Sequence, residues 1–226
     1  MTIRRQPPKT TNQDGDPRRI GVEIEFGGLD LDRAAKLVEQ VFGGGIERSG
    51  AHMRKVTGTD IGDFEIELDA QVVHPKADAD EFEKKAKEWI GDLSANFVPT
   101  EIVGPPAPLG SLDDFDELIS ALRDAGAEGT EDGLSYAFGL QLNPEVPSTD
   151  AAEILRILQA YVLMSPLLRK RIRVDPLRRI LPYVDPFPAD YARRILKPDY
   201  APDLAQLIDD LPLPPDAKIC ILPSFP

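Results

Sequence analysis

Two segments of the chain alternate between apolar and acidic residues, one at 19–26 (RIGVEIEF) and one at 63–69 (DFEIELD). Successive side chains of a β-strand point to opposite faces, so a period of two predicts a strand with one buried and one polar face. We therefore predict a strand in each segment. The polar faces of these strands would carry the following acids: Glu23, Glu25, Asp63, Glu65, Glu67 and Asp69.

A helical spacing follows the first strand. Asp30 can cap a helix that runs to about Phe42, and the three glycines at 43–45 would end it. Ser111 opens a capping-box pattern for a second helix, with Asp114 in place of the usual Glu. The remaining predicted helices lie at 80–96, 149–168, 188–196 and 201–211, and the remaining predicted strands at 46–57, 100–103 and 135–143.

The two-faced strands also indicate the fold class. Strands of a doubly wound parallel sheet are apolar on both faces, whereas strands of an antiparallel sheet with one open face alternate. We predict an α+β fold in which helices cover one face of a mostly antiparallel sheet. Residues 1–18 are predicted to be a flexible tail and residues 19–226 a single domain, although prolines become frequent after Pro144 and favour short elements there.

The net charge, the cysteine count and the lack of long apolar runs limit the kinds of partner that we expect. The formal net charge of −13 argues against a general affinity for nucleic acid or an anionic membrane. A single cysteine, Cys220, cannot form an internal disulfide, and the N-terminus has no apolar signal segment. No apolar run reaches the roughly 20 residues of a membrane span. We expect a cytoplasmic protein that binds neither nucleic acid nor membrane.

The acidic strand faces require an explanation, because like charges directly across a sheet destabilise it. A third predicted strand begins near Glu101 and adds another acid. A divalent cation or a basic cluster elsewhere would offset the repulsion; alternatively, the strands are not neighbours. The basic segment 168–180 contains Arg171 and Arg173, which would either contact phosphate or form a solvated helix end.

Four segments, in this order, resemble the putative amidoligase family, a relative of the glutamine synthetase and glutamate–cysteine ligase superfamily. They are GVEIEF (21–26), GTDIGDFEIELDA (58–70), EIVGPPAP (101–108) and SYAFGLQLNPEVPS (135–148). The resemblance implies a curved antiparallel sheet with a glutamine synthetase-like catalytic core. It also implies ATP- and Mg²⁺-dependent condensation of a carboxylate with an amine, on small-molecule or peptide substrates, through an acyl phosphate.

The resemblance suggests a role for individual residues. Glu25 and Glu67 would be catalytic, while Gln141, Asn143, Arg171 and Arg173 would contact the nucleotide. Gln141 stands where ligases of this superfamily often carry His, which puts an acid–base role at this position in doubt. Superfamily relatives include oligomers, so an oligomer is left open. The expected Mg²⁺ ligands are Glu23, Glu25, Glu65, Glu67 and Glu101.

The sequence ends on an apolar segment, ICILPSFP, that in similar proteins leads into a further portion, so a truncated C-terminus is one expectation. Two other interpretations compete with a ligase. A short chain with Gln141 would also suit a non-catalytic interaction module or an incomplete pseudo-enzyme that retains the sheet. A metal-dependent hydrolase that uses the same acids is the third interpretation.

Overall fold

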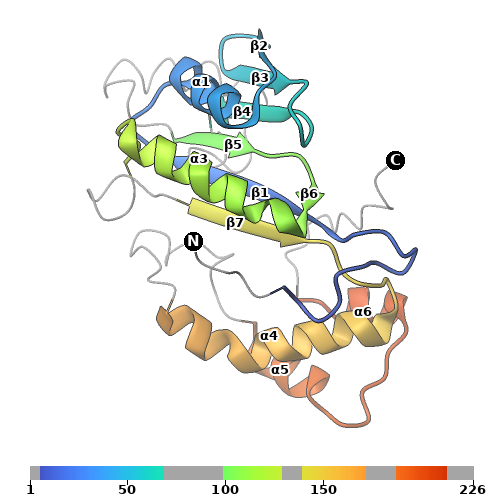
Figure 1. The fold of residues 1–226 in the computed structure, drawn as a ribbon. Helices are drawn as coiled ribbons and strands as arrows, with labels where there is room; N and C mark the ends of the chain where they lie inside the picture. Colours follow the sequence, from blue (N-terminus) through green and yellow to red (C-terminus); the bar gives the residue numbers. More distant parts are fainter. Residues whose placement is uncertain (1–5, 69–98, 129–138, 172–186, 213–226) are drawn as a thin grey trace. The chain divides into compact units, whose positions relative to one another are not determined.

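The computed structural model describes residues 6–68, 99–128, 139–171 and 187–212. The chain divides into two units, Met1–Pro147 and Ser148–Pro226 (Figure 1). The predicted helix at 80–96 lies outside the described residues, as do Asp69, Arg173, Cys220 and residues 135–138 of a predicted strand.

The described residues of the first unit form an open sheet of seven strands, and all of their pairings are antiparallel. The order runs β2-β3-β4-β5-β1, and β6 and β7 also pair with β1. β5 and β6 pair with successive parts of β1, and β7 pairs along its other side. The strands are β1 Arg19–Phe26, β2 Gly45–Arg48, β3 Met53–Thr57, β4 Phe64–Leu68, β5 Thr100–Val103, β6 Ala107–Pro108 and β7 Gly139–Pro144.

Helix α1 (Leu31–Phe42) forms because its apolar residues recur at helical spacing and bury one face against the sheet. Asp30 Oδ1 accepts a hydrogen bond from the Arg33 amide at 2.7 Å, which confirms the predicted N-cap. Gly43 follows the helix with a φ of 73°, a conformation that glycine adopts without steric cost. The buried residues of α1 are Leu31, Ala34, Ala35, Leu37, Val38 and Phe42.

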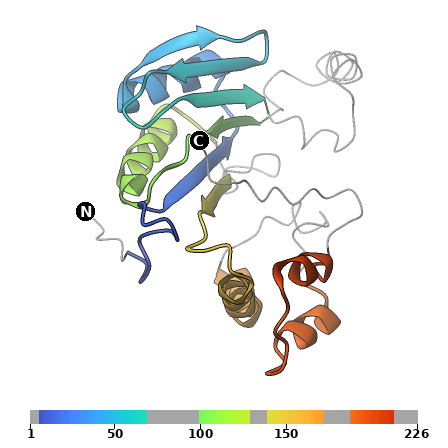
Figure 2. The ribbon, with the colours of Figure 1, turned by 90° about the vertical axis from the view of Figure 1, so that its right-hand side faces the viewer.

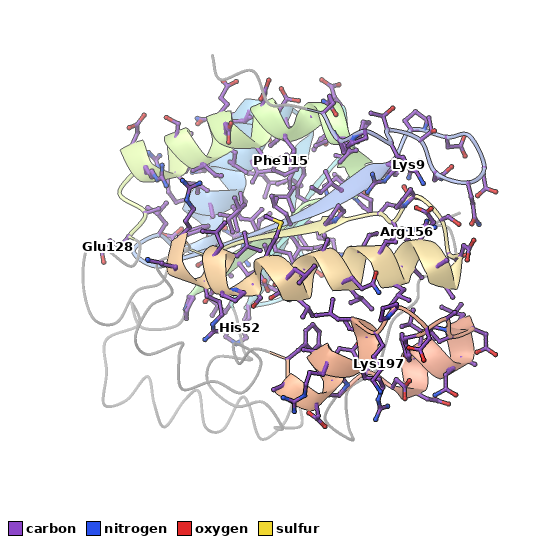
Figure 3. The ribbon with its side chains drawn as sticks, turned by 90° about the horizontal axis from the view of Figure 1, so that it is seen from below. Lys9, His52, Phe115, Glu128, Arg156 and Lys197 are labelled. Atoms are coloured by element: carbon purple, nitrogen blue, oxygen red, sulfur yellow. The ribbon has the colours of Figure 1, made fainter. Side chains whose placement is uncertain are left out.

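Helix α3 (Leu112–Asp124) packs in the same core as α1, and both helices lie on one side of the sheet (Figure 2). The predicted capping box is wrong, because the Ser111 side chain makes no capping hydrogen bond. Two acids in the first turn, Asp113 and Asp114, are instead placed to favour the helix dipole. Phe115 points from α3 toward the strands (Figure 3), and its ring lies 5.3 Å from that of Phe42.

The predicted single strand at 46–57 is wrong, because this segment is a hairpin. β2 and β3 pair with each other through Glu47 and Lys55 among other residues. The Ser49 amide donates to the Met53 carbonyl at 3.3 Å, and Gly50 between them has a φ of 94°. The hairpin extends the sheet beyond β4 and makes β2 one of its edges.

The segment before β1 is held by hydrogen bonds to the end of β7. The Arg18 guanidinium donates to the Glu145 carbonyl, with 2.7 Å from Nε. Asn12 donates to the Glu145 carboxylate at 3.0 Å, and the Arg19 amide donates to the same carboxylate at 2.9 Å. Burial, the largest single effect, raises the pKa of Glu145, but the hydrogen bonds from Asn12 and the Arg19 amide and the charges of Arg18 and Arg19 together depress it below its ordinary value.

The described residues of the second unit, 148–171 and 187–212, form three helices close to the predicted ranges: α4 (Ala151–Arg171), α5 (Ala189–Ile195) and α6 (Leu204–Asp209). Their core consists of Leu155, Tyr191, Ile195 and Leu207. α4 is the one helix in the described part of the chain with the length and composition of a membrane span, contrary to the expectation that no segment reaches them. Length and composition do not separate a span from a core helix, and α4 also buries Leu155 against α5 and α6.

Candidate functional site

The sheet surface opposite α1 and α3 carries five glutamates on β1, β4 and β5, and we call this surface the carboxylate face. The strand residues that alternate with these glutamates, such as Ile24, Ile66 and Ile102, are fully buried in the core. The glutamates themselves are half-buried. They are Glu23 and Glu25 on β1, Glu65 and Glu67 on β4, and Glu101 on β5.

Three of these glutamates form a continuous row across three adjacent strands. Glu101 on β5 pairs in register with Glu25 on one side and with Glu67 on the other. Directly opposed Cβ atoms in an antiparallel sheet lie roughly 5 Å apart, so the three side chains are neighbours. The alternative in which the acidic strands lie apart therefore does not apply. We call Glu25, Glu101 and Glu67 the glutamate row.

The next row along the strands is mixed in charge. Its members, from β7 to β2, are Gln141, Glu23, Val103, Glu65, Lys55 and Glu47. Val103 separates the two glutamates of this row, which reduces their mutual repulsion. Both also have a donor on a neighbouring strand: Asn143 donates to Glu23 Oε1 at 2.7 Å, and Lys55 Nζ lies 2.5 Å from Glu65 Oε1.

The electrostatics of the face combine clustered negative charge with one lysine. The hydrogen bond and charge of Glu65 raise the pKa of Lys55, and Asp63 and Glu47 add to the effect, so the ammonium is charged at neutral pH. In the glutamate row, the Oε1 atom of Glu25 is buried. A carboxylate oxygen withdrawn from water binds a cation more strongly than an exposed one, because water no longer competes for it.

The glutamate row fits a hard divalent cation by the chemistry of its donors. Mg²⁺ prefers oxygen ligands, and carboxylates on neighbouring strands supply them from a rigid platform. Among the described residues, no group of three or more His, Cys, Asp or Glu side chains is gathered to hold a metal ion. The glutamates therefore share a row without converging on one point, and binding would require their side chains to change rotamer.

The predicted nucleotide contacts lie in different parts of the chain. Gln141 and Asn143 project from β7 beside Glu23, and Gln141 donates to Asn143 at 3.2 Å. Arg171 is the exposed last residue of α4 in the second unit, and Arg173 lies outside the described residues. The structure thus brings Gln141 and Asn143 to the carboxylate face.

Two charged features of β3 were not predicted from the sequence. One is Lys55, whose place beside Glu65 depends on the pairing of β3 with β4. The other is a contact between Arg54 and Asp32, with 2.6 Å between Nε and Oδ1, on the helix side of the sheet. The alternation in the segment MRKVT places neighbouring basic residues on opposite faces, but their partners come from other elements.

An α+β protein with an open antiparallel sheet and a carboxylate-lined face is the class that these observations define. A model of the family described as "Putative amidoligase enzyme" matches residues 16–213, which is most of the chain. The protein therefore belongs to this amidoligase family, as the four sequence segments predicted, and the family assignment supports a ligase in general terms. No curated protein and no solved structure shows a significant match to the chain.

Proposed function

We propose that this protein is an ATP- and Mg²⁺-dependent ligase that joins a carboxylate to an amine through an acyl phosphate. The observation that carries the proposal is the glutamate row, because it concentrates hard oxygen ligands at the centre of the sheet in a member of the amidoligase family. We further propose a glutamine synthetase-like core, small-molecule or peptide substrates, and activity in the cytoplasm.

The proposed reaction has two steps. A carboxylate oxygen attacks the γ-phosphorus of ATP, the bond to the bridging oxygen breaks, and ADP leaves. The amine nitrogen then attacks the acyl carbon, loses a proton and displaces inorganic phosphate, which leaves an amide. When bound, Mg²⁺ neutralises phosphate charge that would otherwise repel the attacking carboxylate.

The residues of the carboxylate face have distinct roles in this proposal. Glu25, Glu67 and Glu101 of the glutamate row would hold the cation, which would supply the positive charge that stabilises the reacting phosphate. Glu23 and Glu65 would add two further carboxylate ligands from the next row. Asn143, which donates to Glu23 at 2.7 Å, orients that carboxylate, and Gln141 orients Asn143.

The test is ADP release from Mg·ATP with a panel of carboxylates and amines. Glu25→Gln and Glu67→Gln remove one ligand charge each with little change in shape, and each is expected to lower the rate by about 100-fold or more. Glu117→Gln, an exposed acid of α3 on the helix side of the sheet, is the matched control and keeps full activity. Unchanged rates in both row variants would overturn the assignment.

The same assay separates the competing interpretations. ADP release that requires the amine acceptor excludes a simple metal-dependent hydrolase. A wild-type protein that binds no Mg·ATP in isothermal titration would favour a non-catalytic interaction module or an incomplete pseudo-enzyme. Circular dichroism of each variant verifies that the fold is intact.

A further inference from the structure

Lys55 is the one basic residue in the two described rows of the carboxylate face. β3 presents it between Glu65 on β4 and Glu47 on β2, its partners in register. Of these two acids, Glu65 takes the lysine, with 2.5 Å between Nζ and Oε1. Glu47 instead accepts a hydrogen bond from the Thr57 hydroxyl at 3.1 Å. Glu65, and not Glu47, is therefore the carboxylate that forms the ion pair with Lys55.

The pair is accessible to a solute. The Lys55 side chain is 37% exposed and the Glu65 side chain is 46% exposed. An ammonium group has three donors, so a partner other than Glu65 can be accommodated. An exposed ion pair contributes little to stability because water solvates both charges, so separating it costs little.

Lys55 also lies within reach of the glutamate row. Glu67 is its diagonal neighbour on β4, since Glu65 is directly opposite and Glu67 is two residues further along. Diagonal neighbours in an antiparallel sheet are roughly 7–8 Å apart between Cα atoms, and a lysine side chain can span most of that distance. A phosphate held at the row through a cation would thus lie beside the lysine.

A metal–phosphate complex would bring a positive group and a negative group to the Lys55–Glu65 pair together. Binding of the cation by Glu65 would remove the partner of Lys55, and binding of the phosphate by Lys55 would remove the partner of Glu65. Exchanging both partners at once leaves each charge with an opposite charge beside it, whereas binding either ion alone leaves Lys55 or Glu65 with only water as a partner. The arrangement therefore favours the complex over its parts.

We propose that Lys55 is a phosphate-binding residue of the site, and that its ion pair with Glu65 opens when a metal–polyphosphate complex binds. This inference rests on the proposed ligase function. It names the polyphosphate of the nucleotide as the group that Lys55 contacts. The lysine is protonated and positioned by Glu65 before the ligand arrives, so binding requires no large movement of the strand.

The test compares Lys55→Met with wild type in isothermal titration. A non-hydrolysable ATP analogue with Mg²⁺, tripolyphosphate with Mg²⁺, and Mn²⁺ alone are the three probes. We expect Lys55→Met to weaken binding of both phosphate ligands at least tenfold and to leave Mn²⁺ binding unchanged or tighter. Lys55→Arg, which keeps the charge, should restore part of the phosphate affinity. Lys36→Met, an exposed lysine of α1, should change none of the three.

The outcomes distinguish this inference from the function it builds on. Wild-type protein that binds no nucleotide with Mg²⁺ contradicts the ligase proposal, and the role of Lys55 with it. Nucleotide binding that stays within twofold of wild type in a folded Lys55→Met variant contradicts the role of Lys55 alone. Lys55 would then be only a counter-ion for Glu65, and Mn²⁺ affinity would rise without a change for phosphate.

Discussion

Asn143 on β7 is a neutral residue that hydrogen-bonds a glutamate of the carboxylate face. Its side-chain amide donates to Glu23 Oε1 at 2.7 Å while its own oxygen accepts from Gln141 at 3.2 Å. This short chain of amides fixes the direction in which the Glu23 carboxylate points. It also places a neutral donor, not a further acid, beside the glutamates.

Replacing Asn143 by aspartate tests that arrangement. Asn143→Asp places a second carboxylate against Glu23, and the repulsion is expected to lower the free energy of unfolding by about 0.5–1 kcal/mol. The loss should shrink in high salt because exposed charges are screened. Asn143→Ala, which only removes the hydrogen bond, serves as a salt-insensitive control. Urea unfolding at low and high salt measures both variants; an Asn143→Asp loss independent of salt would contradict the electrostatic explanation.

On the helix side of the sheet, Asp32 and Arg54 form the pair that ties the first turn of α1 to β3. Arg54 is only 9% exposed, and it also donates to the carbonyls of Gly50 and Met53. Its hydrogen bond to Asp32 depresses the pKa of that carboxyl below its ordinary value. A depressed carboxyl pKa stabilises the fold at pH values above the unfolded pKa.

The stability of the first unit should therefore depend on this pair in acid. As the pH falls from 5 toward and through the depressed pKa of Asp32, its contribution is lost. Asp32→Asn should lower stability at pH 7, and the gap to wild type should narrow below about pH 4. Urea unfolding at pH 7 and pH 3 measures the gap, with the exposed Asp60→Asn as control. A gap of equal size at both pH values would contradict this prediction.

At the scale of elements, Gly104 determines how closely α3 approaches β1. A Cβ atom at this position would lie 2.9 Å from Phe115 Cε1 and 3.2 Å from the Val22 carbonyl oxygen. The Gly104 amide also donates to that carbonyl at 2.8 Å, so the backbone cannot easily withdraw. The aromatic contact of Phe115 with Phe42 and Phe64 depends on this close approach.

Gly104→Ala should consequently destabilise the first unit by about 1–3 kcal/mol, the usual range for overpacking a core. Gly110→Ala is the matched control, because no atom lies within 4 Å of its added methyl group. Chemical denaturation of both variants gives the comparison. Equal stabilities would show that α3 can move away from the sheet without cost.

At the scale of the whole molecule, the second unit has a pH-dependent contact of its own, which should act in alkali. In the second unit, the Tyr200 hydroxyl donates to Asp210 Oδ2 at 2.7 Å, and the Arg194 guanidinium lies 2.5 Å from Oδ1. Burial, followed by the hydrogen bond to Asp210, raises the pKa of Tyr200 to about 12. The neutral phenol is thus favoured in the folded unit.

A raised phenol pKa stabilises the second unit fully below the unfolded pKa of about 10, and that contribution disappears as the pH rises toward 12. Tyr200→Phe should lower stability at pH 8 by about 0.5–1.5 kcal/mol, for the lost hydrogen bond, and lose less than wild type between pH 8 and pH 11. Unfolding followed by the helical circular dichroism signal is the measurement. Tyr161→Phe, at an exposed position of α4, should behave like wild type; a Tyr200→Phe loss as steep as that of wild type would contradict the prediction.

Much of the fold follows from short-range pattern in the sequence. The alternation of Glu23 and Glu25 with Val22 and Ile24 predicts which side of β1 is polar, because side chains in a strand repeat with a period of two. Asp30 predicts the start of α1 for an equally local reason, since its side chain bonds an amide three residues away. The resemblance of four segments likewise predicted the family.

Tertiary structure decided which of these groups meet. Glu25, Glu101 and Glu67 are separated by long stretches of chain, and their alignment in one row depends on the register of β1 with β5 and of β5 with β4. Lys55 meets Glu65 through the pairing of β3 with β4, and Asn143 meets Glu23 through the pairing of β7 with β1. A sequence pattern specifies the face on which a side chain lies, but register arises from the packing of distant strands, and the candidate site consists of such pairings.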